Sequence, residues 1–169
     1  MAAQKKVMRY MLKEYYGIPA ESGGSTTYYY VNTGFTQMDE SGGAQVDTEA
    51  FIGDKNASTT VTGYENGWEF DSQYIKGDPV SKDIRDIAVY QKTGTDCERE
   101  LVSIDLTEPD TGENEYKARK FKIAVEAVPP QGEPRSVTHM TGTMHQLGDY
   151  IPGTFNVTTM TFTPETASV

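Results

Sequence analysis

Apolar and polar residues alternate along most of the chain with a period of two, which is typical of β-strands that have one buried face. In residues 67–75, Trp68, Phe70 and Tyr74 share one face, and mainly polar side chains share the other. The pattern predicts a strand there and others at residues 26–31, 44–52, 59–64, 99–107, 115–128, 136–147 and 154–163. We expect the run 44–52 to be half-buried, because Val46 and Ile52 fall on its apolar face.

Asn66-Gly67 lies between two of these runs, and an Asn-Gly pair in that setting is a strong signal for a tight hairpin. We therefore expect residues 59–64 and 67–75 to pair with each other. The alternation also changes phase near Arg119 and Lys120, which predicts a β-bulge. A second phase change falls within residues 154–163. Long strands with phase changes suit a barrel or curved sheets.

One amphipathic helix is expected at about residues 79–91. Asp78 suits the N-cap and Pro79 suits the first helical position. An apolar stripe follows at helical spacing, and it consists of Val80, Ile84 and Ile87. The polar residues between them are expected to face water, namely Lys82, Asp83, Arg85 and Asp86. A single helix of this kind in a β-rich domain usually covers one face or end of the sheets.

The N-terminal region differs from the rest of the chain. Residues 5–16 fit a helix and a strand equally well, so the pattern leaves both open. We expect residues 1–25 to form a basic arm. The polar, glycine-containing stretch 33–44 is expected to form a projecting loop.

Composition indicates a folded chain with a thin core. Leu, Ile, Val and Phe make up only 30 of 169 residues, and the net charge is −10, a combination that is common in disordered chains. The alternation, 11 Tyr and 21 Thr instead favour a mainly β domain spanning residues 1–169. A domain with so few aliphatic residues could complete its burial against copies of itself.

The charge is unevenly distributed. Residues 1–20 carry a net charge of +3, which leaves −13 on residues 21–169. An acidic body argues against ordinary nucleic-acid binding, which requires basic side chains on phosphates. The basic start could dock on a neighbour's acidic surface or could be a solvated charge run.

The candidate chemistry is sparse, and we expect no enzyme, no cofactor and no metal site. Cys97 is alone, and His139 and His145 would lie about 20 Å apart on a strand, too far to share a metal. The acidic run 108–115 lacks the order of a calcium loop. The chain has neither a long apolar window nor a secretory signal, so we expect no membrane insertion by this chain and folding in a cytosol.

Several stretches, taken in order, resemble the tail tube (major tail) proteins of long-tailed bacteriophages. They are RYMLKEYY, GFTQMDE (34–40), FIGDKNASTTVTGYENGWEFDSQYIKGDPV (51–80), the helix into YQKTG (90–94), YKARKFKIAVEAV (116–128) and HMTGTMHQLGDYIPGTFNVTTMTFTP (139–164). The resemblance implies an antiparallel β-sandwich of curved sheets with one flanking helix. It further implies that six copies join their strands into a ring-shaped β-barrel and that the rings stack into a tube.

The same resemblance implies partners and a place in the cell. The tube would surround the tape measure protein, would contact tail terminator and distal tail or baseplate proteins, and would later let double-stranded DNA pass without binding it. The chain would belong to the virion tail and would be assembled in the cytoplasm of the bacterial host.

Two sets of residues are candidates for these contacts. We expect Glu69 and Asp71, opposite the Trp68 face, to line the lumen, although alternation alone also allows the tube exterior. Ring stacking is assigned to the arm and to the polar loop, which together contribute Lys5, Lys6, Met8, Arg9, Tyr10, Leu12, Asp39 and Glu40. Because exposed ion pairs contribute little, the apolar arm residues should supply most of the docking energy.

Other classes of protein remain open. The chain could be another virion β-sandwich, such as a neck, baseplate or host-attachment subunit, or the tube of a phage-derived contractile particle that carries no DNA. A soluble binding module or a hydrolase is a less favoured alternative.

Overall fold

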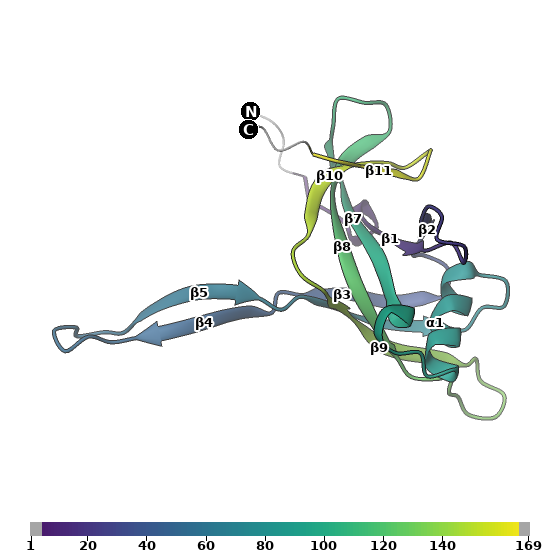
Figure 1. The fold of residues 1–169 in the computed structure, drawn as a ribbon, viewed down its shortest axis with the longest axis horizontal. Coiled ribbons are helices and arrows are strands. Elements are labelled where there is room, and N and C mark those ends of the chain that lie inside the picture. The colour runs from purple at the N-terminus through teal and green to yellow at the C-terminus, as the bar shows by residue number, and fades with distance from the viewer. Residues whose placement is uncertain (1–4, 166–169) are drawn as a thin grey trace.

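The computed structural model describes residues 5–165, and most of them form one strongly curled antiparallel sheet (Figure 1). The sheet has the strand order β2-β1-β7-β8-β9-β6-β3, with β10 paired to β8 and β11 paired to β10. The predicted mainly β fold of curved sheets is confirmed. The strands are β1 Leu12–Ile18, β2 Thr27–Tyr30, β3 Phe35–Ser41, β6 Gly67–Gln73, β7 Glu98–Pro109, β8 Glu115–Ala127, β9 His139–Gln146, β10 Ile151–Asn156 and β11 Thr161–Pro164. Short 3-10 turns occur at Arg9–Met11 and Gly94–Cys97.

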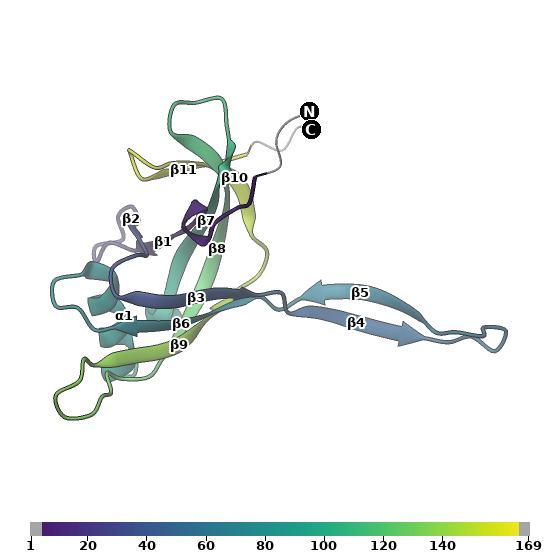
Figure 2. The ribbon, with the colours of Figure 1, turned by 180° about the vertical axis from the view of Figure 1, so that it is seen from behind.

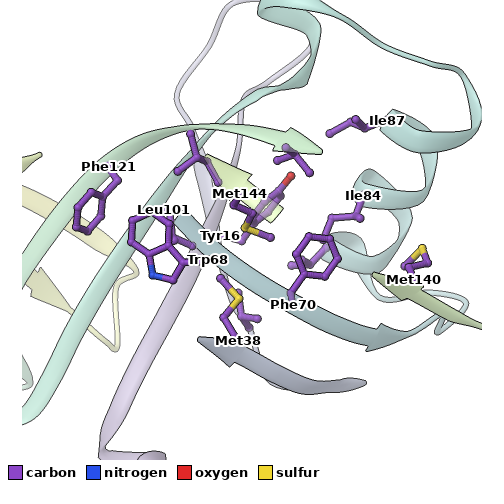
Figure 3. Packing of buried hydrophobic residues seen from close by; sticks show 14 residues of the cluster. Tyr16, Met38, Trp68, Phe70, Ile84, Ile87, Leu101, Phe121, Met140 and Met144 are labelled. Carbon is purple, nitrogen blue, oxygen red and sulfur yellow. The ribbon is translucent and has the colours of Figure 1, made fainter. Parts of the chain in front are cut away.

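The main core lies inside the curl of the sheet (Figure 3). Tyr16, Leu101 and Phe121 are cross-strand neighbours on β1, β7 and β8, and all three are fully buried. Trp68 packs edge-on against Phe121, with 4.7 Å between the ring centroids. The strand face predicted from the alternation around Trp68 is therefore confirmed as a core face.

A second, smaller core lies on the opposite face of the same strands. There Tyr15 and Val102 pack with Phe155 of β10, and the Tyr15 and Phe155 ring centroids lie 4.5 Å apart. Because successive residues of a strand point to opposite faces, β1, β7 and β8 are apolar on both sides where the two cores overlap.

This arrangement corrects the predicted bulge near Arg119 and Lys120. β8 runs through these residues without a register shift against β7 or β10, and the shift lies instead in β7 between Ile104 and Pro109. Ala118 packs in the smaller core, and Phe121 packs in the main core. The change of phase therefore marks a change in which face of the strand is covered.

The second phase change is a turn. Residues 157–160 connect β10 to β11, and Met160 adopts a positive φ of 53°. The predicted single strand at 154–163 is thus two strands that pair with each other, Phe155 opposite Phe162.

The helix α1, Pro79–Val89, is confirmed and ends two residues before the expected position. The Asp78 carboxylate accepts a hydrogen bond from the Ser81 backbone N–H at 2.7 Å, as the predicted N-cap should. The apolar stripe of the helix, Val80, Ile84 and Ile87, is buried in the main core, so α1 closes one side of the curl (Figure 3).

Asp83 is not in water, contrary to the expectation from helical spacing. Its carboxylate accepts two hydrogen bonds from the Arg99 guanidinium, at 2.7 and 2.8 Å, and one from the Tyr16 hydroxyl at 2.8 Å. The Arg99 side chain is 7% exposed and that of Asp83 is 13% exposed. A largely buried ion pair therefore joins α1 to β7 and β1.

A long hairpin projects from the body (Figures 1 and 2). It consists of β4 Ala44–Glu49 and β5 Ser58–Tyr64, which pair only with each other. β3 pairs with β6 and β4 pairs with β5, so residues 35–73 form one long two-stranded ribbon. The two ladders meet at Gly43 and Glu65, where the Glu65 N–H donates to the Gly43 carbonyl.

This ribbon overturns three local predictions. Residues 59–64 and 67–75 do not form a hairpin at Asn66-Gly67, because each run pairs with the strand on the opposite side of the ribbon. The stretch 33–44 is not a loop, because Phe35–Ser41 is the edge strand β3. The run 44–52 is not half-buried, because every residue of β4 is exposed.

Candidate assembly surfaces

Glu69 and Asp71 lie on the sheet face opposite Trp68, as the alternation predicts. Cross-strand pairing places Asp39 and Thr143 on either side of Glu69, and Gln37 and Thr141 on either side of Asp71. We call this surface of β3, β6, β9 and the adjoining end of β8 the polar face. Its side chains are Gln37, Asp39, Glu69, Asp71, Glu126, His139, Thr141, Thr143 and His145.

The polar face is acidic, and part of its charge is paired with imidazoles. His139 Nδ1 lies 3.0 Å from Asp71 Oδ1, and His145 Nε2 lies 2.7 Å from Glu126 Oε2. Asp39 and Glu69 are directly opposite each other, and like charges in that position destabilise a sheet.

The basic arm is shorter than predicted. Residues 1–4 lie outside the described part of the chain, and residues 12–25 are not an arm, because Leu12–Ile18 is the interior strand β1. Lys5 and Lys6 are exposed, as are Met8 and Tyr10. Only residues 5–11 of the described chain therefore precede the sheet.

Arg9 anchors this segment to the body. Its guanidinium donates to the Leu12 carbonyl at 2.6 Å, to the Met38 carbonyl of β3 at 2.8 Å and to the Glu14 carboxylate at 3.1 Å. Burial raises the pKa of the Glu14 carboxyl above its usual value, and the charge of Arg9 opposes that rise. Arg9 is thus tied to its own chain.

The predicted pair Asp39 and Glu40 is split between the two faces of β3. Asp39 belongs to the polar face, whereas the carboxylate of Glu40 accepts two hydrogen bonds from Arg119, at 3.0 and 2.8 Å. The structure does not bring Lys5 or Lys6 onto either carboxylate. Asp39 and Glu40 therefore do not form one acidic patch.

The sequence patterns did not identify the hairpin of β4 and β5 as a surface of interest. Val46 and Val61 face each other across it and are 59% and 52% exposed. At its tip Phe51 is 68% exposed and Ile52 is 110% exposed. An available signal was the turn sequence Gly53-Asp54 directly after this apolar pair.

The structure also contains a hollow of about 890 Å³ at the open end of the curl. Three buried residues lie side by side across the strands β1, β7 and β8, namely Tyr16, Leu101 and Phe121. Two residues away along each strand, on the same face, lies a second set of cross-strand neighbours, Glu14, Ser103 and Arg119. These three residues are polar, and all of them line the hollow. The remaining walls come from β3, β7, β8, β10 and β11, with Leu12 and Tyr150 among the exposed apolar lining residues.

Within residues 5–165, no three His, Cys, Asp or Glu side chains are grouped so that they could hold a metal ion. The Cys97 thiol donates to the Gly94 carbonyl at 3.1 Å. In the same range, no helix has the length and apolarity required to cross a membrane.

Comparison with solved structures identifies the fold. The SPP1 tail tube is similar with a TM-score of 0.59 and 11% identity, over 87% of this chain and 78% of that chain. The anti-feeding prophage (AFP) baseplate is similar with a TM-score of 0.50 and 5% identity, over 93% of this chain and 99% of that chain. Neither the family models nor the curated proteins match the sequence. The chain therefore has the fold seen in these two structural assemblies.

Proposed function

We propose that this chain is a structural subunit of a phage tail tube, and that six copies form a ring and the rings stack into a hollow conduit for genome delivery. The hairpin of β4 and β5 is the observation that carries the proposal. An isolated two-stranded hairpin is at best marginally stable in water, and this one leaves Val46, Val61, Phe51 and Ile52 uncovered by its own chain. Contacts with further copies would bury these side chains.

The sheet edges support ring formation. β3 has a partner on one side only, and so has β2 at the other end of the strand order. Free edges invite pairing with another chain, and a head-to-tail interface closes into a ring when its rotation completes a circle. In this proposal the curled sheets of neighbouring copies continue into one barrel.

We assign the polar face to the lumen, with Glu69 and Asp71 at its centre. DNA binding depends on the neutralisation of phosphates by basic side chains, so an acidic wall would let the genome slide. His139 and His145 contact only Asp71 and Glu126 on this face, so Asp39 and Glu69 have no imidazole partner within residues 5–165.

Ring stacking is assigned to the hairpin together with the segment that precedes β1. The hairpin takes the role that the sequence suggested for residues 33–44. Lys5, Lys6, Met8 and Tyr10 are exposed and free to contribute. The Leu12 side chain is 38% exposed and could contribute as well. Arg9 and Glu40 would act indirectly, because the side chain of each is bonded within its own subunit.

A tube with this role would have the tape measure protein inside it and tail terminator and distal tail or baseplate proteins at its ends. The subunit would be made in the host cytoplasm and would end in the virion tail. These partners follow from the proposed role.

A second candidate is a tube or baseplate subunit of a phage-derived contractile particle. The similarity to the AFP baseplate favours it, since the match spans 99% of that chain. The two candidates share ring formation and differ in cargo. A tube through which DNA passes should have the acidic polar face on its inner wall. The inner wall of a particle that carries no DNA does not need to be acidic.

Electron microscopy of the concentrated full chain, alone and with a tape measure protein, tests the proposal. We expect rings or tubes with six copies around the axis. A chain that stays monomeric under all these conditions, as judged by size-exclusion chromatography and negative staining, would overturn it. A stable monomer that binds a sugar would instead favour a binding module.

A further inference from the structure

We propose that Asn66 is a deamidation site that the folded chain protects and that opening of the ribbon of residues 35–73 exposes. Asn66-Gly67 is the only Asn-Gly pair in the sequence. The structure does not use it as a hairpin turn and places it beside the point where the two ladders of the ribbon meet. This chemistry is independent of the proposed tube function.

An asparagine followed by glycine is prone to an intramolecular reaction. The Gly67 backbone nitrogen gives up its proton and attacks Cγ of Asn66, the bond from Cγ to Nδ2 breaks, and Nδ2 takes up a proton and leaves as ammonia. Water then opens the resulting five-membered succinimide at either carbonyl. The products are an aspartate and an isoaspartate, in which the backbone runs through the side-chain carbon. Glycine favours the attack because it has no Cβ and moves freely.

The folded structure holds the attacking nitrogen in place. The Gly67 N–H donates to the Ser41 hydroxyl at 3.1 Å, and the same hydroxyl donates to the Gly67 carbonyl at 3.1 Å. The Asn66 carbonyl accepts from the Gln146 N–H at 3.0 Å. Gly67 is buried, and it has cross-strand partners on both sides, Ser41 of β3 and His145 of β9. The peptide that joins Asn66 to Gly67 is therefore fixed between two strands, and its nitrogen cannot turn toward Cγ.

The side chain of Asn66 is held less firmly than its backbone. Its Nδ2 donates to the Glu40 carboxylate at 3.3 Å, and its Oδ1 is buried without a hydrogen-bond partner within residues 5–165. Asn66 is only partly buried, so water can reach it once the strands separate. Protection therefore depends on the closed ribbon and not on the amide group.

Gly43 closes the ribbon next to this pair. The Glu65 N–H donates to the Gly43 carbonyl at 2.8 Å, and Gly43 has a positive φ of 45°. A Cβ at position 43 would overlap the Glu65 carbonyl oxygen, so glycine is required for this contact. Segments of a folded protein open locally at a lower free energy than the whole molecule does. The rate of deamidation at Asn66 should therefore report how often this contact opens.

Either product would disturb the ribbon. An aspartate at position 66 would put a second carboxylate beside Glu40, where Asn66 now donates a hydrogen bond. An isoaspartate adds one atom to the backbone, so the residues on its two sides could not both keep their register with the neighbouring strands. A modified chain should therefore have a displaced hairpin of β4 and β5.

Peptide mass spectrometry of the unmodified protein tests the site. The protein is incubated folded and in urea at the same mildly alkaline pH, and each asparagine peptide is analysed for succinimide, aspartate and isoaspartate. In urea, Asn66 should convert well ahead of Asn156, which is followed by the bulky Val157. In the folded protein the rate at Asn66 should be lower by about tenfold or more, which corresponds to an opening free energy of at least about 1.4 kcal/mol. Conversion no faster than at Asn156 in urea, or equally fast in both states, would refute the proposal.

Two neighbouring glycines provide a matched pair of variants. Gly43→Ala should raise the folded-state rate at Asn66 toward the rate in urea, because the added methyl group overlaps the Glu65 carbonyl. Gly42→Ala meets no atom within 4 Å and should leave the rate unchanged. Equal rates in the two variants, with circular dichroism showing both folded, would mean that the closed ribbon does not protect the site. If Gly43→Ala does not fold, the comparison of the unmodified protein in its two states still decides.

Discussion

Asp83 and Arg99 form the most enclosed ion pair in the described chain, and they connect the helix to the middle of the sheet. Removing one partner of a buried pair leaves an uncompensated charge and typically costs about 3–5 kcal/mol. We expect Asp83→Asn to lower the free energy of unfolding by roughly that amount, measured by urea denaturation. The control is Asp86→Asn, because Asp86 pairs with the adjacent Arg85 near the surface and such pairs contribute little to stability. Equal losses in the two variants would contradict this interpretation of the network.

Glu14 provides a pH-dependent prediction at the same scale. Burial raises the pKa of its carboxyl in the folded state, so the folded chain holds this proton more tightly than the unfolded chain does. The stability that Glu14 contributes is therefore full below its ordinary pKa and is lost as the pH rises through the raised value. In Glu14→Gln this loss is absent.

The free energy of unfolding of Glu14→Gln, relative to the unmodified protein, should thus increase as the pH rises from about 4 to 7. Urea denaturation at several pH values measures it. Glu133→Gln, at an exposed loop position, controls for the removal of one carboxyl group. A relative stability that falls with rising pH would show that the Arg9 charge outweighs burial.

At the scale of elements, the hairpin of β4 and β5 is structurally separate from the body. Its two strands pair only with each other and form a sheet separate from that of the body. Deleting residues 44–64 leaves a four-residue connection between Ser41 and Gly67, which are already paired. We expect a folded body whose free energy of unfolding changes by less than about 1 kcal/mol, because no buried residue is removed.

The same deletion should abolish tube formation if the hairpin joins the rings. Circular dichroism and denaturation verify the body, and negative-stain microscopy counts the tubes. Full-length tubes from the shortened chain would exclude the hairpin from stacking. An unfolded product would mean that the ribbon of residues 35–73 folds as one unit.

At the scale of the whole molecule, the polar face predicts how a tube would treat DNA. Glu69→Lys combined with Asp71→Lys should still assemble, because both side chains point away from the two cores. The altered wall should retain double-stranded DNA in a salt-dependent manner and impair genome ejection, because phosphate contacts weaken as salt rises. Glu21→Lys with Glu133→Lys, on exposed loops, is the matched change in net charge. Equal DNA retention and normal infectivity in both double variants would exclude the polar face from the lumen.

Features that depend on neighbours along the chain were predictable from the sequence. The N-cap at Asp78, the buried stripe of α1 and the core face at Trp68 all follow from spacings of two to seven residues, which the backbone geometry converts directly into a face. The alternation also placed the candidate residues Glu69 and Asp71 on the solvent-facing side of that strand.

The tertiary structure decided what pairs with each strand and what covers each face. Asn66-Gly67 favours a local turn, yet residues 67–73 gain a longer ladder with β3 and β9. The phase change at Arg119 reflects two cores on opposite faces, and alternation shows that a face is covered without showing by what. Asp83 bonds to Arg99, which lies 16 positions away in the sequence. The hollow is lined by residues from both ends of the chain. Such features arise from long-range packing, which residue spacing does not record.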